Sequence, residues 1–458
     1  MKIIVFNGSP KGKLSMTMQY INYIEKVFPQ HELKIFDISQ KLRTIEKDEK
    51  VFQEIINEVR SSDGVLWTFP LYLHLVHSNY KRFIELIFER KVTDAFRDKY
   101  TAAISTSIHF HDHTAHNYIN AICDDLNMKY VDFFSAGMSD LLKESCQNKL
   151  TLFAENFFEA IENNEPTSKN YIPIIHNNFD YHPGIPADRI EVGDKKVVIV
   201  TDARADQNNL NAMIDRFTQS FSKDIEVVNL NKLDIKGGCL GCLNCGFDNI
   251  CAYQGKDEFI NFFITKVKSA DILIFAGAIE DRYLSSRWKL FFDRSFFNTH
   301  QPMLTGTQFG FIISGPLRQL PNVKEIFKAY VEWQQGNLVD FITDEYEESS
   351  KIDDLLQNLA SRLVKFSDKK YIKPATFRGI GGMKVFRDDI WGKLRFVFQA
   401  DHKFYKKHRL YDFPQKDYKV RILNSIMMTI TKIPFIRKEI PKRIKNEMLK
   451  PLQKVVEN

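Results

Sequence analysis

Four of the six cysteines lie within one short stretch of the chain, with the spacing C-x2-C-x2-C-x5-C behind a pair of glycines. They are Cys239, Cys242, Cys245 and Cys251. Thiolates at such short intervals can surround a compact metal centre, and glycines allow the backbone to fold closely around it. Cys123 and Cys146 stand alone, which does not fit a disulfide framework. The spacing predicts a metal or redox centre.

A second stretch, residues 7–17, has the composition of an anion-binding loop. It reads Asn-Gly-Ser-Pro-Lys-Gly-Lys-Leu-Ser-Met-Thr between an apolar run and a helical pattern. Unpaired N–H groups and the dipole at a helix start favour an anion, and the serines, threonine and lysines add hydroxyl groups and positive charge. The loop therefore predicts a phosphate monoester site; its spacing disfavours ATP and a Rossmann dinucleotide. The alternative is a plain strand-to-helix turn capped by serine.

The elements around these stretches indicate a duplicated α/β unit. Short apolar runs alternate with helical patterns, as in parallel sheets covered by helices. We expect strands at 3–6, 33–36, 65–69 and 102–105, with a helix at 80–88, and then again strands at 197–200, 225–230, 272–275 and 309–313, with helices at 210–221 and 284–296. Residues 63–85 align without a gap with 271–293. The expected domains are therefore 1–165 and 195–370, with a linker at 166–194 and a C-terminal extension at 371–458.

The anion-binding loop resembles the Gly-Ser-Pro-Arg-x-x-Ser-x-Thr motif of the NADPH-dependent FMN reductase family, which is flavodoxin-like, with Lys11 in place of the arginine. After the third strand that family has Pro-(Leu/Val)-Tyr, and Pro70-Leu71-Tyr72 stands there in this chain. The resemblance implies an α/β fold with two flavodoxin-like doubly wound parallel sheets in tandem, and FMN in the first domain. The residues implied to bind the FMN phosphate are Ser9, Lys11, Ser15 and Thr17, and those implied to border the flavin ring are Pro70, Leu71 and Tyr72. We expect Met16, Thr106 and Ser107 to bind the cofactor as well.

The loop after the fourth strand contains four histidines: His109, His111, His113 and His116. In the family this loop closes over the flavin ring. Its histidines could bind a metal ion, contact a substrate above the flavin, or cap the next helix. We expect His109 and Tyr72 to lie beside the acceptor as the catalytic groups.

The cysteine spacing resembles that of iron–sulfur flavoproteins of the same superfamily, where it binds a 4Fe–4S cluster. Zinc bound by four cysteines is an alternative, although zinc ribbons separate two C-x2-C pairs by a longer loop. Thiols that bind no metal are the second alternative. The first domain has no cysteine between its second and third strands.

The second domain departs from the flavin pattern. Its first loop, 201–209, has two acidic residues and lacks the Gly-Ser-Pro turn, and Ala278-Ile279-Glu280 replaces Pro70-Leu71-Tyr72. In dimeric iron–sulfur flavoproteins the cluster of one subunit lies near the FMN of the other. By that resemblance the two domains form a pseudo-dimer within one chain, and the chain could also form a homodimer.

The basic character of the chain resides in its C-terminal extension, predicted to be mainly helical. Residues 371–458 carry 21 Lys and Arg against 8 Asp and Glu, whereas the remaining residues carry 43 against 50. Such an extension could contact a membrane surface or an acidic partner, or pack on the domains with a solvated basic face. No nucleic-acid-binding module is recognisable. The start of the chain has no secretory signal pattern, so we expect a cytoplasmic protein.

Together these features predict an FMN-dependent NAD(P)H:acceptor oxidoreductase with a 4Fe–4S relay. NAD(P)H is the expected transient donor, and the acceptor is a small molecule or a redox protein. One alternative is an electron-transfer flavoprotein without a substrate pocket, and another is a zinc-stabilised sensor or scaffold.

Overall fold

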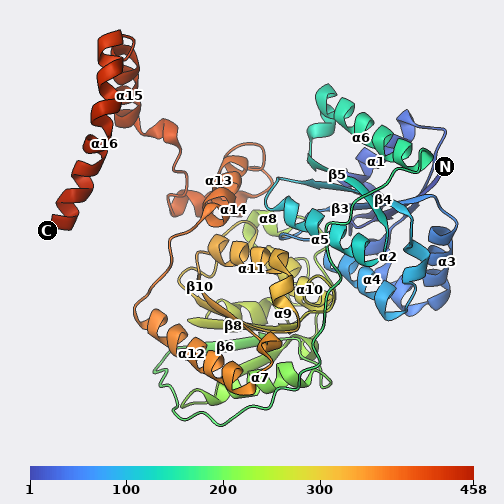
Figure 1. Cartoon of the computed structure of the whole chain (residues 1–458), viewed down its shortest axis with the longest axis horizontal. Helices are drawn as coiled ribbons and strands as arrows, with labels where there is room; N and C mark the ends of the chain where they lie inside the picture. The colour runs from blue at the N-terminus through green and yellow to red at the C-terminus, as the bar shows by residue number, and fades with distance from the viewer. Residues whose placement is uncertain (458) are drawn as a thin grey trace. The chain divides into compact units, whose positions relative to one another are not determined.

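The computed structural model describes residues 1–457, apart from the side chain of Lys445. These residues form two compact units, the first comprising Met1–Lys403 and the second beginning at Phe404. The first unit contains two five-stranded parallel sheets (Figure 1). This arrangement confirms the predicted fold class: two flavodoxin-like sheets in tandem and a helical C-terminal region.

The first sheet has the strand order β2-β1-β3-β4-β5. Its strands are β1 (Lys2–Asn7), β2 (Glu32–Phe36), β3 (Gly64–Pro70), β4 (Tyr100–Ser107) and β5 (Lys129–Gly137). The helices are α1 (Met16–Val27), α2 (Ile38–Lys47), α3 (Glu49–Arg60), α4 (Ser78–Glu89), α5 (Asp112–Asp125) and α6 (Glu144–Glu162). α1 and α6 pack on one face with a core that includes Ile3, Val5 and Phe157. The central strands are buried on both faces, as expected for a sheet covered by helices on both sides.

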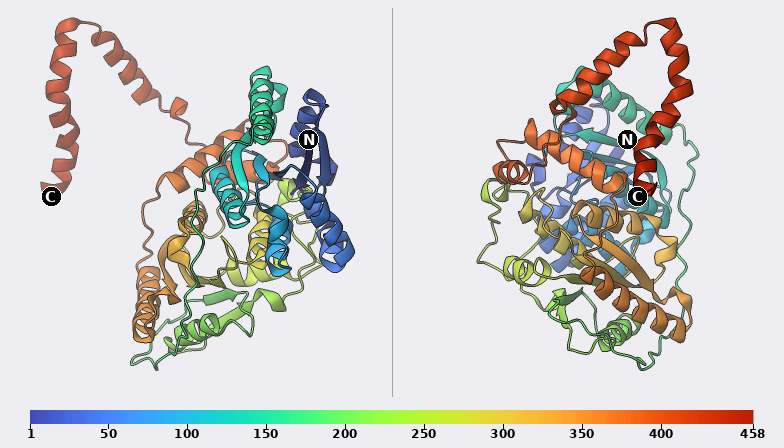
Figure 2. Two further views of the ribbon diagram at one scale, coloured as in Figure 1. Left: turned by 45° about the vertical axis from the view of Figure 1, so that its right-hand side comes forward. Right: turned by 90° about the vertical axis from the view of Figure 1, so that its left-hand side faces the viewer.

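The second sheet repeats this topology with the order β10-β9-β8-β6-β7. Its strands are β6 (Val197–Thr201), β7 (Glu226–Asn229), β8 (Ile272–Ala278), β9 (Gln308–Ser314) and β10 (Asn337–Thr343). The helices are α7 (Asn208–Gln219), α8 (Cys245–Asp248), α9 (Phe259–Phe262), α10 (Ser286–Ser295), α11 (Pro321–Trp333) and α12 (Ser349–Asp368). The segment between α6 and β6 contains no helix and runs along the outside of the second sheet (Figure 2).

The two sheets are joined through α4 and α10, which occupy equivalent positions in the duplication. The carboxylate of Glu85 in α4 accepts hydrogen bonds from the Ser286 N–H and hydroxyl at the start of α10, at 2.5 and 2.6 Å. Asp293 in α10 accepts a hydrogen bond of 2.7 Å from the Ser78 N–H at the start of α4. Each carboxylate thus supplies an acceptor for the unpaired N–H groups of the opposite helix. The contact has the reciprocal form of a two-fold interface.

The C-terminal region contains four helices: α13 (Phe377–Trp391), α14 (Gln399–Lys407), α15 (Tyr418–Ile430) and α16 (Pro434–Glu457). α13 belongs to the first compact unit and packs against α11. Its Phe386 is buried against Phe110 and Trp333, with ring centroids 4.4 and 5.7 Å away. This helix therefore covers the loop that follows β4.

Candidate functional site

The loops at the carboxyl ends of β1, β3 and β4 meet at one edge of the first sheet. The N–H of Gly8 donates to the carbonyl of Thr68 at 2.7 Å. The N–H of Leu71 donates to the carbonyl of Thr106 at 3.1 Å, and the hydroxyl oxygens of Thr17 and Thr106 are 2.6 Å apart. This edge is where flavodoxin-like sheets bind ligands. The residues predicted to hold the phosphate and those predicted to border the ring are thereby brought together.

The predicted phosphate loop has an ordered set of internal hydrogen bonds. Side-chain oxygens of Asn7, Ser9 and Ser15 accept from the N–H groups of Ser9, Lys11 and Thr17 at 3.0, 3.2 and 3.2 Å. Ser15 is the N-cap of α1. The hydroxyl-bearing residues are buried, whereas Lys11 and Met16 are exposed. A helix start with a capping serine and an exposed lysine fits an anionic group, because both charge and helix dipole favour it.

The histidines of the β4–α5 loop separate into different environments. His109 is half-exposed, and its Nδ1 lies 2.9 Å from a carboxylate oxygen of Asp112, a hydrogen bond that raises the pKa of His109. His116 is buried, its Nε2 is 2.8 Å from the Ser105 hydroxyl, and burial lowers its pKa to about 4. His116 therefore packs under the loop as a neutral side chain, while His109 faces solvent. A role for His109 beside an acceptor stays a prediction.

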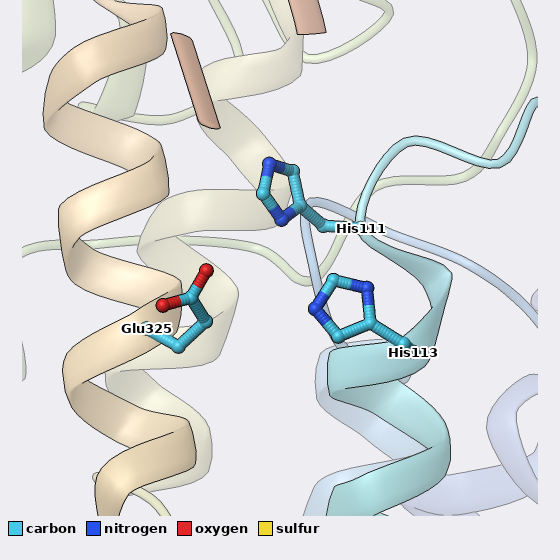
Figure 3. A group of neighbouring side chains, drawn as sticks. All are labelled: His111, His113 and Glu325. Carbon is cyan, nitrogen blue, oxygen red and sulfur yellow. The ribbon is translucent and has the colours of Figure 1, made fainter. Parts of the chain in front are cut away.

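His111 and His113 form a small cluster with Glu325 of α11, and Figure 3 shows the three side chains converging. One ligand atom from each lies within 4.8 Å of the others, an arrangement that could hold a metal ion. Arg378 of α13, however, donates to both oxygens of Glu325 at 2.5 to 2.8 Å. Although burial opposes ionisation, this guanidinium lowers the pKa of Glu325. A cation would have to share Glu325 with Arg378, so the cluster's clearest role is to join the two domains and α13.

Glu325 and Arg378 were not predicted as partners of the histidine loop. They lie on exposed helical patterns more than 200 positions along the chain from His111, and such patterns indicate only a solvated face. Tertiary packing alone brings them together.

The cysteine loop of the second domain lies against the loops of the first domain that are predicted to bind FMN. His77 donates a hydrogen bond from Nε2 to the carbonyl of Cys239 at 2.9 Å. Gly241 adopts a φ of +62°, and a Cβ at this position would lie 2.5 Å from the Tyr72 hydroxyl and 3.0 Å from Cε of Lys11. A side chain at Gly241 would therefore collide with the Tyr72 hydroxyl and displace the flexible end of Lys11, and the left-handed backbone favours glycine independently. The contact places the cysteine loop directly on Tyr72 and Lys11.

The four cysteines are free thiols with unequal exposure: Cys245 is buried, Cys239 and Cys251 are intermediate, and Cys242 is exposed. Burial raises the pKa of Cys239 and Cys245 to about 12, and the charges of the neighbouring cysteines contribute in the same direction. The thiols are thus close enough to influence one another. The Gly241 N–H donates to Sγ of Cys239 at 3.4 Å, as is common for metal-binding sulfurs.

The spacing of these sulfur atoms bears on the kind of metal. Zinc–sulfur bonds of ~2.3 Å in a tetrahedral site hold the sulfurs about 3.8 Å apart. Among the cysteines that the structure describes, no three sulfur atoms lie within 4.8 Å of one another. A four-iron cluster is larger and needs wider spacing. The described thiols therefore do not form a preformed tetrahedral zinc site, and a 4Fe–4S cluster at these cysteines stays a prediction.

The equivalent edge of the second sheet is unsuited to a phosphate. Arg204, in the first loop, pairs with Glu280 at 2.7 Å. Asp202 is buried, and burial raises its pKa to about 6. The one exposed arginine of this loop is thereby neutralised by Glu280, and two further acids, Asp202 and Asp206, stand beside it. The negative charge at this edge makes anion binding less favourable here than in the first domain.

The first domain is similar to a known protein family. Residues 1–138 match the family model described as NADPH-dependent FMN reductase. The predicted resemblance is confirmed. At the level of the family, the match also confirms the prediction of an NAD(P)H-dependent flavin oxidoreductase that uses FMN.

Solved structures similar to the chain have low sequence identity to it. FerB, a flavoenzyme NAD(P)H:(acceptor) oxidoreductase from Paracoccus denitrificans, is 16% identical, with 35% of this chain and 97% of that chain covered and a TM-score of 0.31. An oxidoreductase from Corynebacterium diphtheriae is 14% identical over 36% of this chain and 98% of its own, with a TM-score of 0.31. General stress protein 14 from Treponema denticola, solved with FMN, is 10% identical over 36% and 99%, with a TM-score of 0.26. Sequence comparison with curated proteins gives no match.

Proposed function

We propose that the chain is an FMN-dependent NAD(P)H:acceptor oxidoreductase in which the first domain holds FMN and the cysteine loop of the second domain holds a 4Fe–4S cluster beside it. The observation that carries the proposal is the contact of Gly241 with Tyr72 and Lys11. It joins the cysteine loop to the residues predicted for the ring and for the phosphate. Domains that function independently would not need this contact.

The residues of the first domain have distinct tasks in this proposal. Lys11 supplies positive charge at the start of α1, where Ser9, Ser15, Met16 and Thr17 would surround the phosphate. Pro70, Leu71, Tyr72, Thr106 and Ser107 would border the ring. His109, which is half-exposed and paired with Asp112, would donate hydrogen bonds to an acceptor.

The residues of the second domain complete the site. Cys239, Cys242, Cys245 and Cys251 would hold the cluster, and the positive φ of Gly241 lets the backbone pass closely over Tyr72. When bound, FMN exchanges a hydride or single electrons and an iron–sulfur cluster exchanges single electrons, so the pair would connect a two-electron donor to other redox partners. NAD(P)H would be the donor, and a small molecule or a redox protein the acceptor.

Anaerobic purification with a spectrum and counts of FMN, iron, sulfide and zinc tests this proposal. One FMN and four irons per chain are expected, together with oxidation of NAD(P)H. Cys242→Ser should lose iron and keep FMN, whereas Lys11→Gln should weaken FMN and keep iron. Two FMN per chain, no FMN, or zinc at the cysteines would overturn the division between the domains. Bound cofactors without NAD(P)H oxidation would favour the electron carrier.

A further inference from the structure

The second compact unit presents an unusual number of exposed apolar side chains. None of the residues of α15 is buried. Large apolar side chains exposed on or beside α15 are Tyr418, Val420, Ile422, Leu423, Ile426, Met427, Met428 and Ile433. Those on α16 are Phe435, Ile444, Met448, Leu449, Leu452, Val455 and Val456. So many exposed apolar groups on adjacent helices indicate a surface that is covered when the protein functions.

These side chains recur at a regular interval along each helix. On α15, Ile422 is followed by Ile426 and Ile430, and Leu423 by Met427, at intervals of four residues. On α16, an apolar residue recurs every fourth position from Ile436 to Val456. Residues four apart lie on the same side of a helix, so each helix has an apolar face.

The remaining faces of this unit are strongly basic. Residues 404–458 carry 14 Lys and Arg against 5 Asp and Glu. None of the described helices is long and apolar enough to span a bilayer. Apolar faces flanked by lysine and arginine, on helices that cannot span, are typical of segments that lie in the plane of a membrane surface.

We propose that α15 and α16 bind the surface of an anionic lipid bilayer. The apolar side chains would enter the boundary between headgroups and acyl chains, and the lysines and arginines would contact anionic headgroups. Pairing with a second copy would bring two surfaces of the same positive charge together, which their mutual repulsion opposes. A bilayer with negative headgroups satisfies the apolar and the charged features together.

Flotation of the full-length protein with lipid vesicles tests the proposal. Vesicles of phosphatidylcholine mixed with phosphatidylserine should carry the protein upward, and vesicles of phosphatidylcholine alone should carry much less. Ile426→Asp on the apolar face of α15 should reduce binding at least about tenfold. Asn424→Asp introduces the same charge on the polar face and should reduce it far less. FMN content and unfolding temperature should stay unchanged in both variants, because both side chains are exposed.

Three results would overturn the proposal. The first is that the protein does not float with anionic vesicles. The second is an equal loss in Ile426→Asp and Asn424→Asp, which would show attraction by charge without entry of the apolar face. The third is a dimer in analytical ultracentrifugation that Ile426→Asp dissociates while vesicle binding is absent, which would assign the apolar faces to a second copy.

Discussion

The imidazole Nε2 of His77 donates a hydrogen bond to the backbone carbonyl of Cys239 across the boundary between the two domains, at 2.9 Å. Its Nδ1 accepts from the N–H of Asn79 at 3.2 Å, at the start of α4. The two bonds require a neutral ring protonated on Nε2, and burial lowers the pKa of His77 accordingly. One side chain thus caps a helix of the flavin-type domain and holds the first cysteine of the other domain.

Replacement of His77 by leucine should loosen the cysteine loop. The Cys239 carbonyl and the Asn79 N–H would lose their partner, at a cost of about 1–3 kcal/mol in the free energy of unfolding. Alkylation of Cys239 followed by mass spectrometry should become faster, while alkylation of Cys146 should not change. His176→Leu is the control, because His176 is exposed. Equal behaviour of the two variants would contradict the role given to His77.

Lys11→Gln should weaken FMN binding about tenfold at low ionic strength, because one exposed positive charge near the phosphate is lost. Riboflavin has no phosphate, so its affinity should be unchanged. Fluorescence titration of both flavins measures the difference. Lys26→Gln removes a charge from the last turn of the same helix and should have little effect. A similar loss for riboflavin and FMN would place Lys11 away from the phosphate.

The buried ion pairs of Lys81 and Lys289 in the α4–α10 contact should differ in how much the loss of one carboxylate destabilises the protein. Lys81 contacts both Glu85 and Asp281 at 3.0 Å, and although burial opposes it, these charges raise the pKa of Lys81. Lys289 pairs with Asp293 in a fully buried site, and burial lowers its pKa. Asp293→Asn should therefore lower the free energy of unfolding by about 3 kcal/mol, and Glu85→Gln by less, because Lys81 retains Asp281. Urea unfolding of both variants measures the order, and the reverse order would contradict it.

The His109–Asp112 pair should make the β4–α5 loop sensitive to pH. The hydrogen bond that His109 donates to Asp112 raises the pKa of His109, so the stabilising effect of the charged imidazole is complete below about pH 6.5 and is lost as the pH rises through the folded pKa. Burial opposes ionisation of Asp112, but the hydrogen bond that Asp112 accepts from His109 lowers the pKa of Asp112, so the contribution of the carboxylate exists above about pH 4 and is lost on acidification. Asp112→Asn should lower the pKa of His109 in an NMR titration, with His109→Gln identifying the resonance. An unchanged pKa would show that the carboxylate does not act on His109.

Much of the fold follows from local sequence patterns. The inner strands β1, β3, β6 and β8 are continuous apolar runs because they are buried on both faces, and this pattern predicts them. In strands β5 and β10, Asp132 and Asp340 interrupt the apolar runs. A local pattern therefore does not indicate these two strands, and only four strands are predicted for each five-stranded sheet. The opposite edge strands, β2 and β7, are also partly exposed, but both are predicted.

The sequence likewise predicts some parts of the candidate site and not others. The phosphate loop and the cysteines are short segments whose residue types carry their chemistry, so the sequence indicates each of them. Their proximity is a different matter. The contacts of Gly241 with Tyr72 and of Glu325 with His111 and Arg378 join residues far apart in the chain, and they depend on how α4, α10 and α13 pack.

The reciprocal capping of α4 and α10 has a consequence for how such a protein can change. In a dimer of identical subunits, every substitution occurs twice, so neither half can lose a binding loop without the other losing it as well. Here Glu85 and Asp293 keep the paired arrangement inside one polypeptide, where each half mutates separately. Covalent linkage also keeps the two unlike halves in a one-to-one ratio at any concentration. The reciprocal contact thus holds together two domains whose binding loops differ.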